Sequence, residues 1–353
     1  MKTSDFDYDL PEDFIAQTPV EPRDASRLLV LDRHSGQIEH SHFSELDRFL
    51  KPNDLLVLNE TRVIPARLFA RKIPSGGRVE LLLIRRKDFL TWEVMVGGKG
   101  LVAGRQLQIE DGPGVEIVDV LDGPNRLVQF SQAIEPFFNK AGHVPLPPYI
   151  HEPLIDPERY QTVYARTLGS AAAPTAGLHF TVGLIDRLQQ YGISFGKVTL
   201  HVGLDTFAPV TEDDPGEHLI HTEWCQVSKE TVLAVRRARQ AGGRVVAVGT
   251  TSVRTLESSA IQARPEESLV PFEGSTGLYI LPGYRFKIVD AMITNFHLPR
   301  STLLMLVSAF TGRERILAAY EEAKELHYRF YSFGDGMLIL LPTDSYKLLR
   351  KFL

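Results

Sequence analysis

The chain has 353 residues, more than one hydrophobic core usually organises, so we expect two domains. Hydrophobic residues make up 43% of it and charged residues 24%, a balance that excludes an intrinsically disordered protein. A net charge of −5 argues against a protein that coats nucleic acid through its overall positive charge, but leaves room for a local basic patch.

One cysteine, Cys225, excludes an intrachain disulfide and a cysteine-rich metal site, and its surroundings indicate a packing role. The first residues have neither the basic nor the apolar region of a signal peptide. The apolar run 303–310 is too short to cross a bilayer. These features predict a cytoplasmic protein that does not enter a membrane.

The N-terminal part predicts two buried strands at 27–31 and 55–58, with a short helix or turn at 44–49 between them. From about 66 to 150 short β-rich segments alternate with Gly- and Pro-rich turns; the segments are 78–84, 91–96, 106–109, 115–120 and 127–130. Short strands at regular spacing are typical of a small β-barrel or sandwich.

After about residue 160 strands and helices alternate. The pattern predicts a helix at 228–240 with Ser228 as N-cap, a strand at 244–248, a helix at 255–263, a strand at 288–293, helices from 301 and 313, and a strand at 336–341. Such alternation indicates a parallel-rich α/β sheet. We therefore expect an α/β catalytic domain formed by 1–65 and 151–353, interrupted by an inserted small antiparallel β-barrel domain at 66–150.

Several stretches between the apolar strands are rich in Gly, Thr, His, Asn and Asp, and ligands of open α/β sheets bind beyond the carboxyl ends of strands. The predicted substrate-binding residues in these stretches are Asn59, Thr61, Arg62, Arg67, Thr175, Gly177, His201, Gly249, Thr250, Thr251, Ser252 and Asn295. Residues 249–252 follow a strand and open a helix, so they could hold a carboxylate or phosphate. The structural alternative is an ordinary N-cap made by Thr251 or Ser252.

Three residues are predicted to be catalytic: His297, His179 and Asp335. A neutral histidine at position 297 could give or take a proton near pH 7. The alternative for His297 is a partly buried histidine with satisfied hydrogen bonds, and the apolar neighbours of His179 and His201 favour that role more strongly. Asp335 stands between two glycines and could bind a ligand or cap a turn.

A metal site is the rival interpretation of His218 and His221, because their i, i+3 spacing places both on one helical face. No cysteine and no further ligand spacing lie nearby, so we expect no metal. The dinucleotide fingerprint, the phosphate-binding P-loop and the G-x-S-x-G nucleophile motif are all missing from the sequence.

A basic run marks the predicted insert, where eight cations are opposed only by Glu80. They are Arg62, Arg67, Arg71, Lys72, Arg78, Arg85, Arg86 and Lys87. The run could form a phosphate-binding surface, or it could be a solvated strand face. Neighbouring side chains of a strand point to opposite faces, so Arg85, Arg86 and Lys87 cannot all face one surface.

Long collinear motifs resemble the S-adenosylmethionine:tRNA ribosyltransferase-isomerase family of queuosine biosynthesis. They cover nearly the whole chain and lie at 6–11, 15–19, 59–67, 145–150, 172–180, 249–254, 294–299 and 328–332. Three positions depart from the family pattern. Leu-Asp-Thr-Phe at 204–207 replaces the usual Ala-Gly-Thr-Phe, Gly336 replaces an alanine, and His151-Glu152 stands where a basic residue is common.

The resemblance implies transfer of the ribosyl group of S-adenosylmethionine to 7-aminomethyl-7-deazaguanine at the wobble position of tRNA. The ribosyl group then rearranges to an epoxycyclopentanediol, and adenine and methionine leave. The implied partners are that tRNA and S-adenosylmethionine, which serves as co-substrate. We expect no other cofactor, and we expect the protein to be a monomer. On residue type and placement we assign His297 or His179 to proton transfer, Asp335 or Asp290 to adenine or ribose, and 249–252 to the methionine carboxylate.

Two other functions compete with this one. An S-adenosylmethionine-dependent tRNA methyltransferase predicts a glycine-rich first strand–helix turn, which we do not find in the sequence. An RNA-binding module that uses the basic insert alone leaves the polar stretches of the α/β domain unexplained.

Overall fold

The computed structural model describes residues 1–203, 209–264 and 267–340, so the departure at 204–207 and the predicted strand end at 341 lie outside the described residues. The chain divides into two compact units. Unit 1 comprises Met1–Arg62, Pro148–Thr167 and the chain from Ala173 onward, and unit 2 comprises Val63–Pro147 and Leu168–Ala172. Unit 2 thus contains a short second segment that the predicted range 66–150 does not include.

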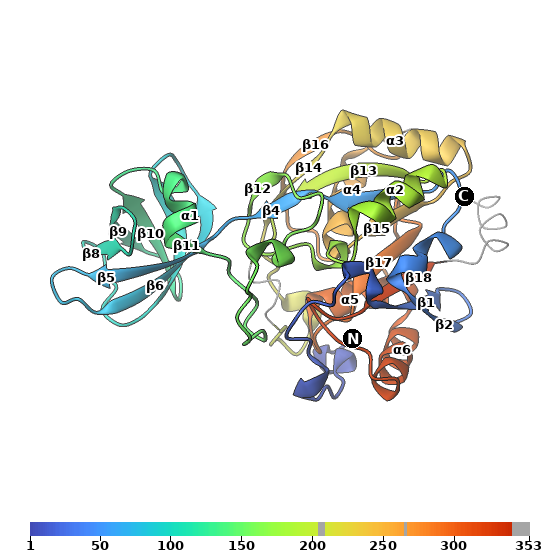
Figure 1. Cartoon of the computed structure of the whole chain (residues 1–353), viewed down its shortest axis with the longest axis horizontal. Coiled ribbons are helices and arrows are strands. Elements are labelled where there is room, and N and C mark those ends of the chain that lie inside the picture. Colours follow the sequence, from blue (N-terminus) through green and yellow to red (C-terminus); the bar gives the residue numbers. More distant parts are fainter. Residues whose placement is uncertain (204–208, 265–266, 341–353) are drawn as a thin grey trace. The chain divides into compact units, whose positions relative to one another are not determined.

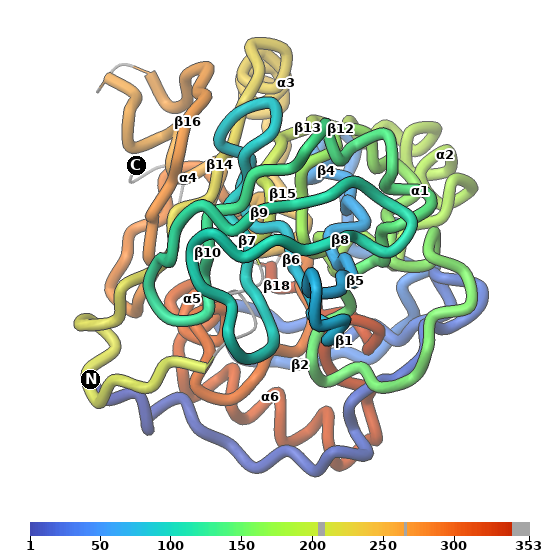
Figure 2. Tube along the Cα trace, turned by 90° about the vertical axis from the view of Figure 1, so that its left-hand side faces the viewer, coloured from blue at the N-terminus to red at the C-terminus, as the bar shows by residue number. Residues whose placement is uncertain are grey.

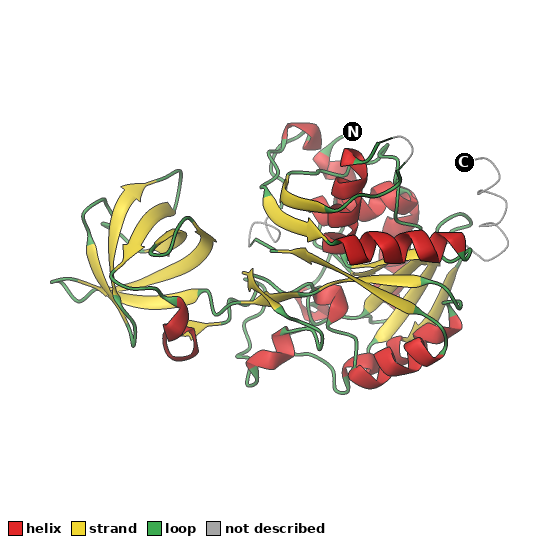
Figure 3. Cartoon of the chain, turned by 90° about the horizontal axis from the view of Figure 1, so that it is seen from above, coloured by secondary structure: helices red, strands yellow, loops and turns green. Residues whose placement is uncertain are grey.

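Unit 1 is built on a mixed nine-stranded sheet (Figures 1 and 3). Its order is β16 (Phe272–Thr276), β14 (Glu223–Val227), β13 (Ser194–Leu200), β3 (Leu55–Asn59), β15 (Val245–Val248), β17 (Ala291–Asn295), β18 (Gly336–Leu340), β1 (Arg27–Asp32) and β2 (Ile38–His42). Strands β13, β3, β15 and β17 are parallel neighbours, whereas β18 is antiparallel to β17 and parallel to β1. The α/β prediction is confirmed.

Helices cover both faces of this sheet, because its central strands are apolar on both sides (Figure 3). Leu55 and Val57 of β3 belong to one core cluster, and Leu56 and Leu58 belong to the other. The first cluster includes apolar residues of α3 (Lys229–Gln240), α4 (Thr250–Gln262), α5 (Thr302–Thr311) and α6 (Arg313–Glu325). The second includes those of α2 (Val182–Gln190) and of the 3-10 helix η4 (Phe43–Arg48).

Two predicted boundaries are wrong, and both errors have a local cause. Helix α4 begins at Thr250 instead of 255, because Gly249 adopts a φ of +85° and turns the chain directly from β15 into the helix. Strand β17 runs Ala291–Asn295 instead of 288–293. The N–H groups of Ile288 and Val289 donate to the buried carboxylate of Glu257, at 3.0 and 3.1 Å, and form no strand pairing there.

Ser228 caps α3 as predicted, since its hydroxyl accepts from the N–H of Thr231 at 3.3 Å. A buried ion pair ties the start of β3 to that of β15: Arg244 Nη2 lies 2.6 Å from Asp54 Oδ2, and both side chains are almost fully buried. No helix among the described residues is long and apolar enough to span a membrane.

The N-terminal stretch, blue in Figures 1 and 2, runs beside α6. Asp5 pairs with Arg313 at 3.4 Å, and the ring of Tyr8 meets that of Tyr320 edge-on at 5.3 Å. Short 3-10 helices punctuate the chain at η1 (Thr3–Phe6), η2 (Glu12–Phe14), η3 (Arg23–Ala25), η5 (Glu135–Phe137), η6 (Pro157–Tyr160), η7 (Thr175–Gly177) and η9 (Pro215–Glu217).

Unit 2 is a closed antiparallel barrel, as the turn-rich pattern predicts. Its six strands, in order, are β5 (Arg67–Lys72), β6 (Arg78–Arg86), β7 (Thr91–Gly97), β10 (Asn125–Phe130), β9 (Gly114–Val120) and β8 (Gln106–Ile109). Strand β8 pairs back with β5 and closes the ring, which leaves no free edge between them. Alternate residues Trp92, Val94 and Val96 of β7 are buried inside.

Three further elements complete the chain. Strand β11 (Gly142–His143) pairs with β5, and the short helix α1 (Phe138–Ala141) precedes it. Strands β4 (Thr61–Val63) and β12 (Thr167–Ser170) form a separate two-stranded sheet.

Candidate functional site

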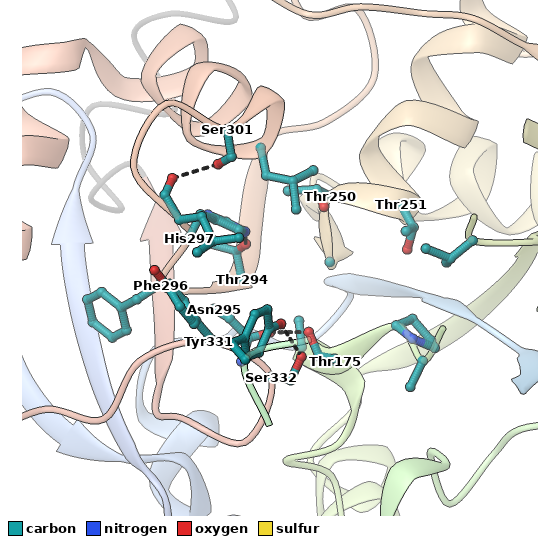
Figure 4. Close-up of a pocket in the computed structure, with 18 residues that line it drawn as sticks. Thr175, Thr250, Thr251, Thr294, Asn295, Phe296, His297, Ser301, Tyr331 and Ser332 are labelled. Carbon is teal, nitrogen blue, oxygen red and sulfur yellow. Dashed lines mark hydrogen bonds between the residues drawn. The ribbon is translucent and has the colours of Figure 1, made fainter. Parts of the chain in front are cut away.

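A pocket lies in unit 1 beyond the carboxyl ends of the parallel strands β15 and β17, where open α/β sheets usually bind ligands (Figure 4). Its polar lining comes from chain segments far apart in sequence: Thr175, Thr250, Thr251, Thr294, Asn295, His297, Ser301, Tyr149, Tyr331 and Ser332. Of the predicted site residues, the lining contains Thr175, Gly249, Thr250, Thr251, Asn295 and His297.

The first turn of α4 forms one wall of this pocket. The N–H groups of Thr250 and Thr251 have no partner inside the helix, as at any helix start. The Ser/Thr N-cap interpretation is wrong: the cap residue is Gly249, Ser252 donates its hydroxyl to Val248 O at 2.7 Å, and Thr251 Oγ1 accepts from Asn59 Nδ2 at 3.2 Å. The positive end of the helix therefore faces the pocket uncapped and can bind an anion.

His297 lies in the pocket wall directly after β17, and its ring is held between two hydroxyls. Nε2 is 3.1 Å from Thr294 Oγ1, and Nδ1 is 3.3 Å from Tyr320 Oη. The backbone is fixed as well, because Tyr320 Oη accepts from the His297 N–H at 2.9 Å and Tyr8 donates to the His297 carbonyl at 2.5 Å. Burial lowers the pKa of His297 to about 3, so the imidazole is neutral at physiological pH.

His179 lies behind the pocket, outside its lining, in a chain of hydrogen bonds. Thr175 Oγ1 donates to Asn295 Oδ1 at 2.8 Å, and Asn295 Nδ2 lies 3.3 Å from His179 Nε2. His179 Nδ1 lies 2.8 Å from Ser26 Oγ, and its ring stacks on Phe43. Burial lowers the pKa of His179 to about 4. A neutral ring with its proton on Nδ1 satisfies every one of these contacts and fixes the orientation of the Asn295 amide.

Asp335 is also outside the pocket lining, and its oxygens are occupied. Oδ1 accepts from the Arg27 N–H at 2.9 Å, while Oδ2 accepts from the Arg329 N–H at 2.8 Å and from the Arg27 guanidinium at 3.2 Å. Asp290, the alternative, accepts from the Val245 N–H at 2.9 Å. Both carboxylates hold the protein backbone in this structure.

Asn59 and its neighbours form a layer behind α4. The Asn59 amide exchanges two hydrogen bonds of 3.0 Å with the backbone of Leu200, which leaves its second N–H to hold Thr251. Thr61 Oγ1 lies 2.9 Å from His201 Nδ1, and the ring of His201 stacks on Trp224 at 5.0 Å. These residues position the pocket wall without lining it.

The remaining predicted residues lie elsewhere. Gly177 packs so tightly that a Cβ at this position would collide with the Tyr164 hydroxyl. Arg62 pairs with Glu158, and Arg67, which belongs to unit 2, pairs with Glu80 at 2.9 Å.

Sequence reasoning missed the aromatic side of the pocket. Tyr149 and Tyr331 lie with ring centroids 4.8 Å apart, and Tyr149 Oη is 2.8 Å from Ser332 Oγ. These residues belong to the motifs at 145–150 and 328–332, but a tyrosine or serine beside prolines and aromatics carries no signal of its own. Only the fold brings them beside His297.

His218 and His221, weighed as metal ligands on one helical face, lie in a segment that is not helical. His218 Nδ1 lies 2.9 Å from Glu212 Oε2. Within the ranges that the structure describes, no three His, Cys, Asp or Glu side chains gather closely enough to hold a metal ion.

Glu80 is the only acid within the basic run, but other parts of unit 2 supply further acids from β7, from the turn after β8 and from η5. Arg71 pairs with Glu110 at 3.2 Å, Arg86 with Glu135 at 3.0 Å, and Arg85 and Lys87 share Glu93 at 2.9 and 3.0 Å. The predicted alternation is confirmed, since Arg85 and Lys87 meet one carboxylate and Arg86 meets another. Unit 2 nevertheless carries eleven Lys and Arg against nine Asp and Glu, whereas the whole chain is acidic.

Comparison with known proteins identifies the family. A family model described as queuosine biosynthesis protein matches residues 3–339. Proteins named S-adenosylmethionine:tRNA ribosyltransferase-isomerase from Symbiobacterium thermophilum and Carboxydothermus hydrogenoformans are each 54% identical, over 96% of this chain and 100% of theirs. A crystal structure of an S-adenosylmethionine tRNA ribosyltransferase from Thermotoga maritima is similar with a TM-score of 0.56 and 42% identity, over 96% of this chain and 100% of that one. The chain therefore belongs to the queuosine biosynthesis protein family.

Proposed function

We propose that this chain transfers the ribosyl moiety of S-adenosylmethionine to 7-aminomethyl-7-deazaguanine at the wobble position of tRNA and isomerises it, giving epoxyqueuosine and releasing adenine and methionine. The observation that carries the proposal is the near full-length identity to enzymes named for this activity. The pocket supports it, because it lies beyond the carboxyl ends of parallel strands, where open α/β sheets bind their ligands.

The uncapped start of α4 is the proposed site of the methionine carboxylate. Two free N–H groups, the helix dipole and the Thr251 hydroxyl point to an anion with several acceptor atoms. The Asn59 amide fixes that hydroxyl from behind, so the wall is rigid before a ligand arrives.

His297 is the proposed proton-transfer residue, since among the three predicted catalytic residues it alone lines the pocket. A pKa of about 3 keeps its imidazole unprotonated, and therefore able to accept a proton, over the whole neutral range. The same low pKa makes His297 a weak base. A weak base is sufficient here, because the sulfonium of the substrate acidifies the adjacent 5′ carbon from which the proton must leave.

His179 and Asp335 are proposed to act from behind the pocket. His179 orients the amide of Asn295, and thereby the polar edge that Asn295 and Thr175 present to the adenosyl group. Asp335 holds Arg27 and the backbone of Arg329 in place and raises the otherwise low pKa of His179. Neither residue needs to touch the reacting atoms in this scheme.

The tRNA phosphates are proposed to lie against unit 2. Its small positive excess in an acidic chain favours that surface, and Arg85 with Lys87 is the best candidate because two cations share the single carboxylate of Glu93. Arg86 has a carboxylate to itself, so it contributes less.

We further propose a cytoplasmic monomer that uses S-adenosylmethionine as co-substrate and no other cofactor. Sedimentation with and without tRNA tests the oligomeric state.

The test of the reaction uses tRNA that carries the 7-aminomethyl-7-deazaguanine base and S-adenosylmethionine labelled separately in its ribosyl and methyl carbons. The proposal expects ribosyl label on the tRNA and methyl label in free methionine, in equal amounts. Methyl label on the tRNA together with S-adenosylhomocysteine would instead support the methyltransferase alternative.

A further inference from the structure

The pocket carries no charged side chain among the described residues that line it. Its one titratable imidazole, His297, is neutral. The buried carboxylates among the described residues of unit 1 are engaged elsewhere: Asp54 with Arg244, Asp335 with Arg27, Glu223 with Arg254, and Glu257 with backbone N–H groups.

This neutrality matters because the proposed co-substrate is a cation at sulfur. Moving a cation from water into a mostly apolar pocket is costly unless some group compensates its charge. The described lining offers no carboxylate for this purpose. The face of an aromatic ring is a protein group that can attract a buried cation without carrying a charge.

Tyr149 and Tyr331 supply two such rings from positions 182 residues apart in the chain. Their centroids lie 4.8 Å apart with the ring planes at 55°, which gives the pair an angled surface beside the pocket. The Tyr149 ring is held because its Oη lies 2.8 Å from Ser332 Oγ. The backbone of Tyr331, with a φ of +67°, is held because its N–H donates to the Phe296 carbonyl at 3.2 Å. Burial raises the pKa of both phenols, so neither becomes an anion.

We propose that Tyr149 and Tyr331 hold the sulfonium of S-adenosylmethionine against their ring faces. The two rings thereby make the site prefer this cation to S-adenosylhomocysteine, its neutral thioether analogue. The inference rests on the proposed function. It predicts selectivity for positive charge at sulfur: each ring contributes roughly 3- to 30-fold to the affinity for S-adenosylmethionine and almost nothing to that for S-adenosylhomocysteine.

Calorimetric titration of the full chain with S-adenosylmethionine and with S-adenosylhomocysteine tests this directly. Wild type should bind the sulfonium compound more tightly. Tyr331→Phe keeps the ring and should keep the ratio of the two dissociation constants, whereas Tyr331→Leu and Tyr149→Leu should each reduce that ratio by roughly 3- to 30-fold. Tyr191→Leu, an exposed tyrosine outside the pocket, is the matched control and should change neither constant.

Several results would overturn the proposal. Equal weakening of both ligands in the leucine variants would mean that the rings only shape the pocket. An intact ratio in both leucine variants would show that the sulfonium is held by groups other than these rings. If the leucine variants fail to fold, the two dissociation constants of the wild type still test the proposal. Equal or tighter binding of S-adenosylhomocysteine by the wild type would contradict selectivity for the sulfonium. A wild type that binds S-adenosylmethionine but modifies no tRNA would instead refute the proposed function.

Discussion

Replacing His297 by glutamine should flatten the acid side of the stability curve of unit 1. The ordinary pKa of 6.5 falls to about 3 in the folded chain, so between these values the unfolded state binds the extra proton. The stabilisation is therefore present above pH 6.5 and is lost as the pH falls. Each pH unit below the ordinary pKa lowers the free energy of unfolding by about 1.4 kcal/mol. Roughly 1.5 such units lie between pH 6.5 and pH 5, so the loss from pH 7 to pH 5 is ~2 kcal/mol.

His179, whose pKa is lowered to about 4, adds a similar ~2 kcal/mol over the same range. Urea unfolding at pH 7, 6 and 5, followed by the fluorescence of Trp224 in a Trp92→Phe background, reports on unit 1 separately from the barrel. His297→Gln should lose ~2 kcal/mol less than the parent between pH 7 and 5. The exposed His34→Gln serves as the control. Parallel pH curves for the parent and His297→Gln would refute the buried, neutral state of this imidazole.

Three further substitutions follow from the packing and charges. Gly177→Ala should lower the unfolding free energy by about 1–3 kcal/mol in thermal melts, because its Cβ collides with a neighbouring hydroxyl, and an unchanged melting temperature would show that the turn can shift. Asp54→Asn should cost about 3–5 kcal/mol by leaving Arg244 buried with a neutral partner, and a loss below 1 kcal/mol in urea unfolding would contradict that burial. Arg85→Gln with Lys87→Gln should reduce the salt dependence of tRNA binding by roughly 0.7–1.8 slope units, and filter binding that gives an unchanged slope would place the phosphates elsewhere.

Local patterns predict the fold well because each core strand of unit 1 is a short apolar run between polar turns. The strands at 27–31, 55–58 and 244–248 correspond to β1, β3 and β15, and the residues that follow β15 do line a pocket. The boundaries of β17 could not be predicted, since a distant carboxylate, Glu257, takes the N–H groups that would have continued the strand.

The site was only partly predictable for the same reason. Thr250, Asn295 and His297 stand at strand ends, where sequence alone suggests chemistry. Whether a histidine lines a pocket or supports it from behind depends on contacts between remote segments, as between His179 and Ser26. Ion pairs between residues far apart in the sequence cannot be recognised from the order of the charges. The unopposed positive charge of the basic run was overestimated for this reason.

The central claim is that the pocket containing His297 carries out ribosyl transfer. Single-turnover adenine release, measured by chromatography after mixing the protein with S-adenosylmethionine and precursor-bearing tRNA, tests it most directly. The account predicts one adenine per modified tRNA for wild type and a rate lower by roughly 10²-fold or more for a folded His297→Gln variant. Near-normal adenine release by that variant, or S-adenosylhomocysteine in place of adenine from wild type, would contradict it.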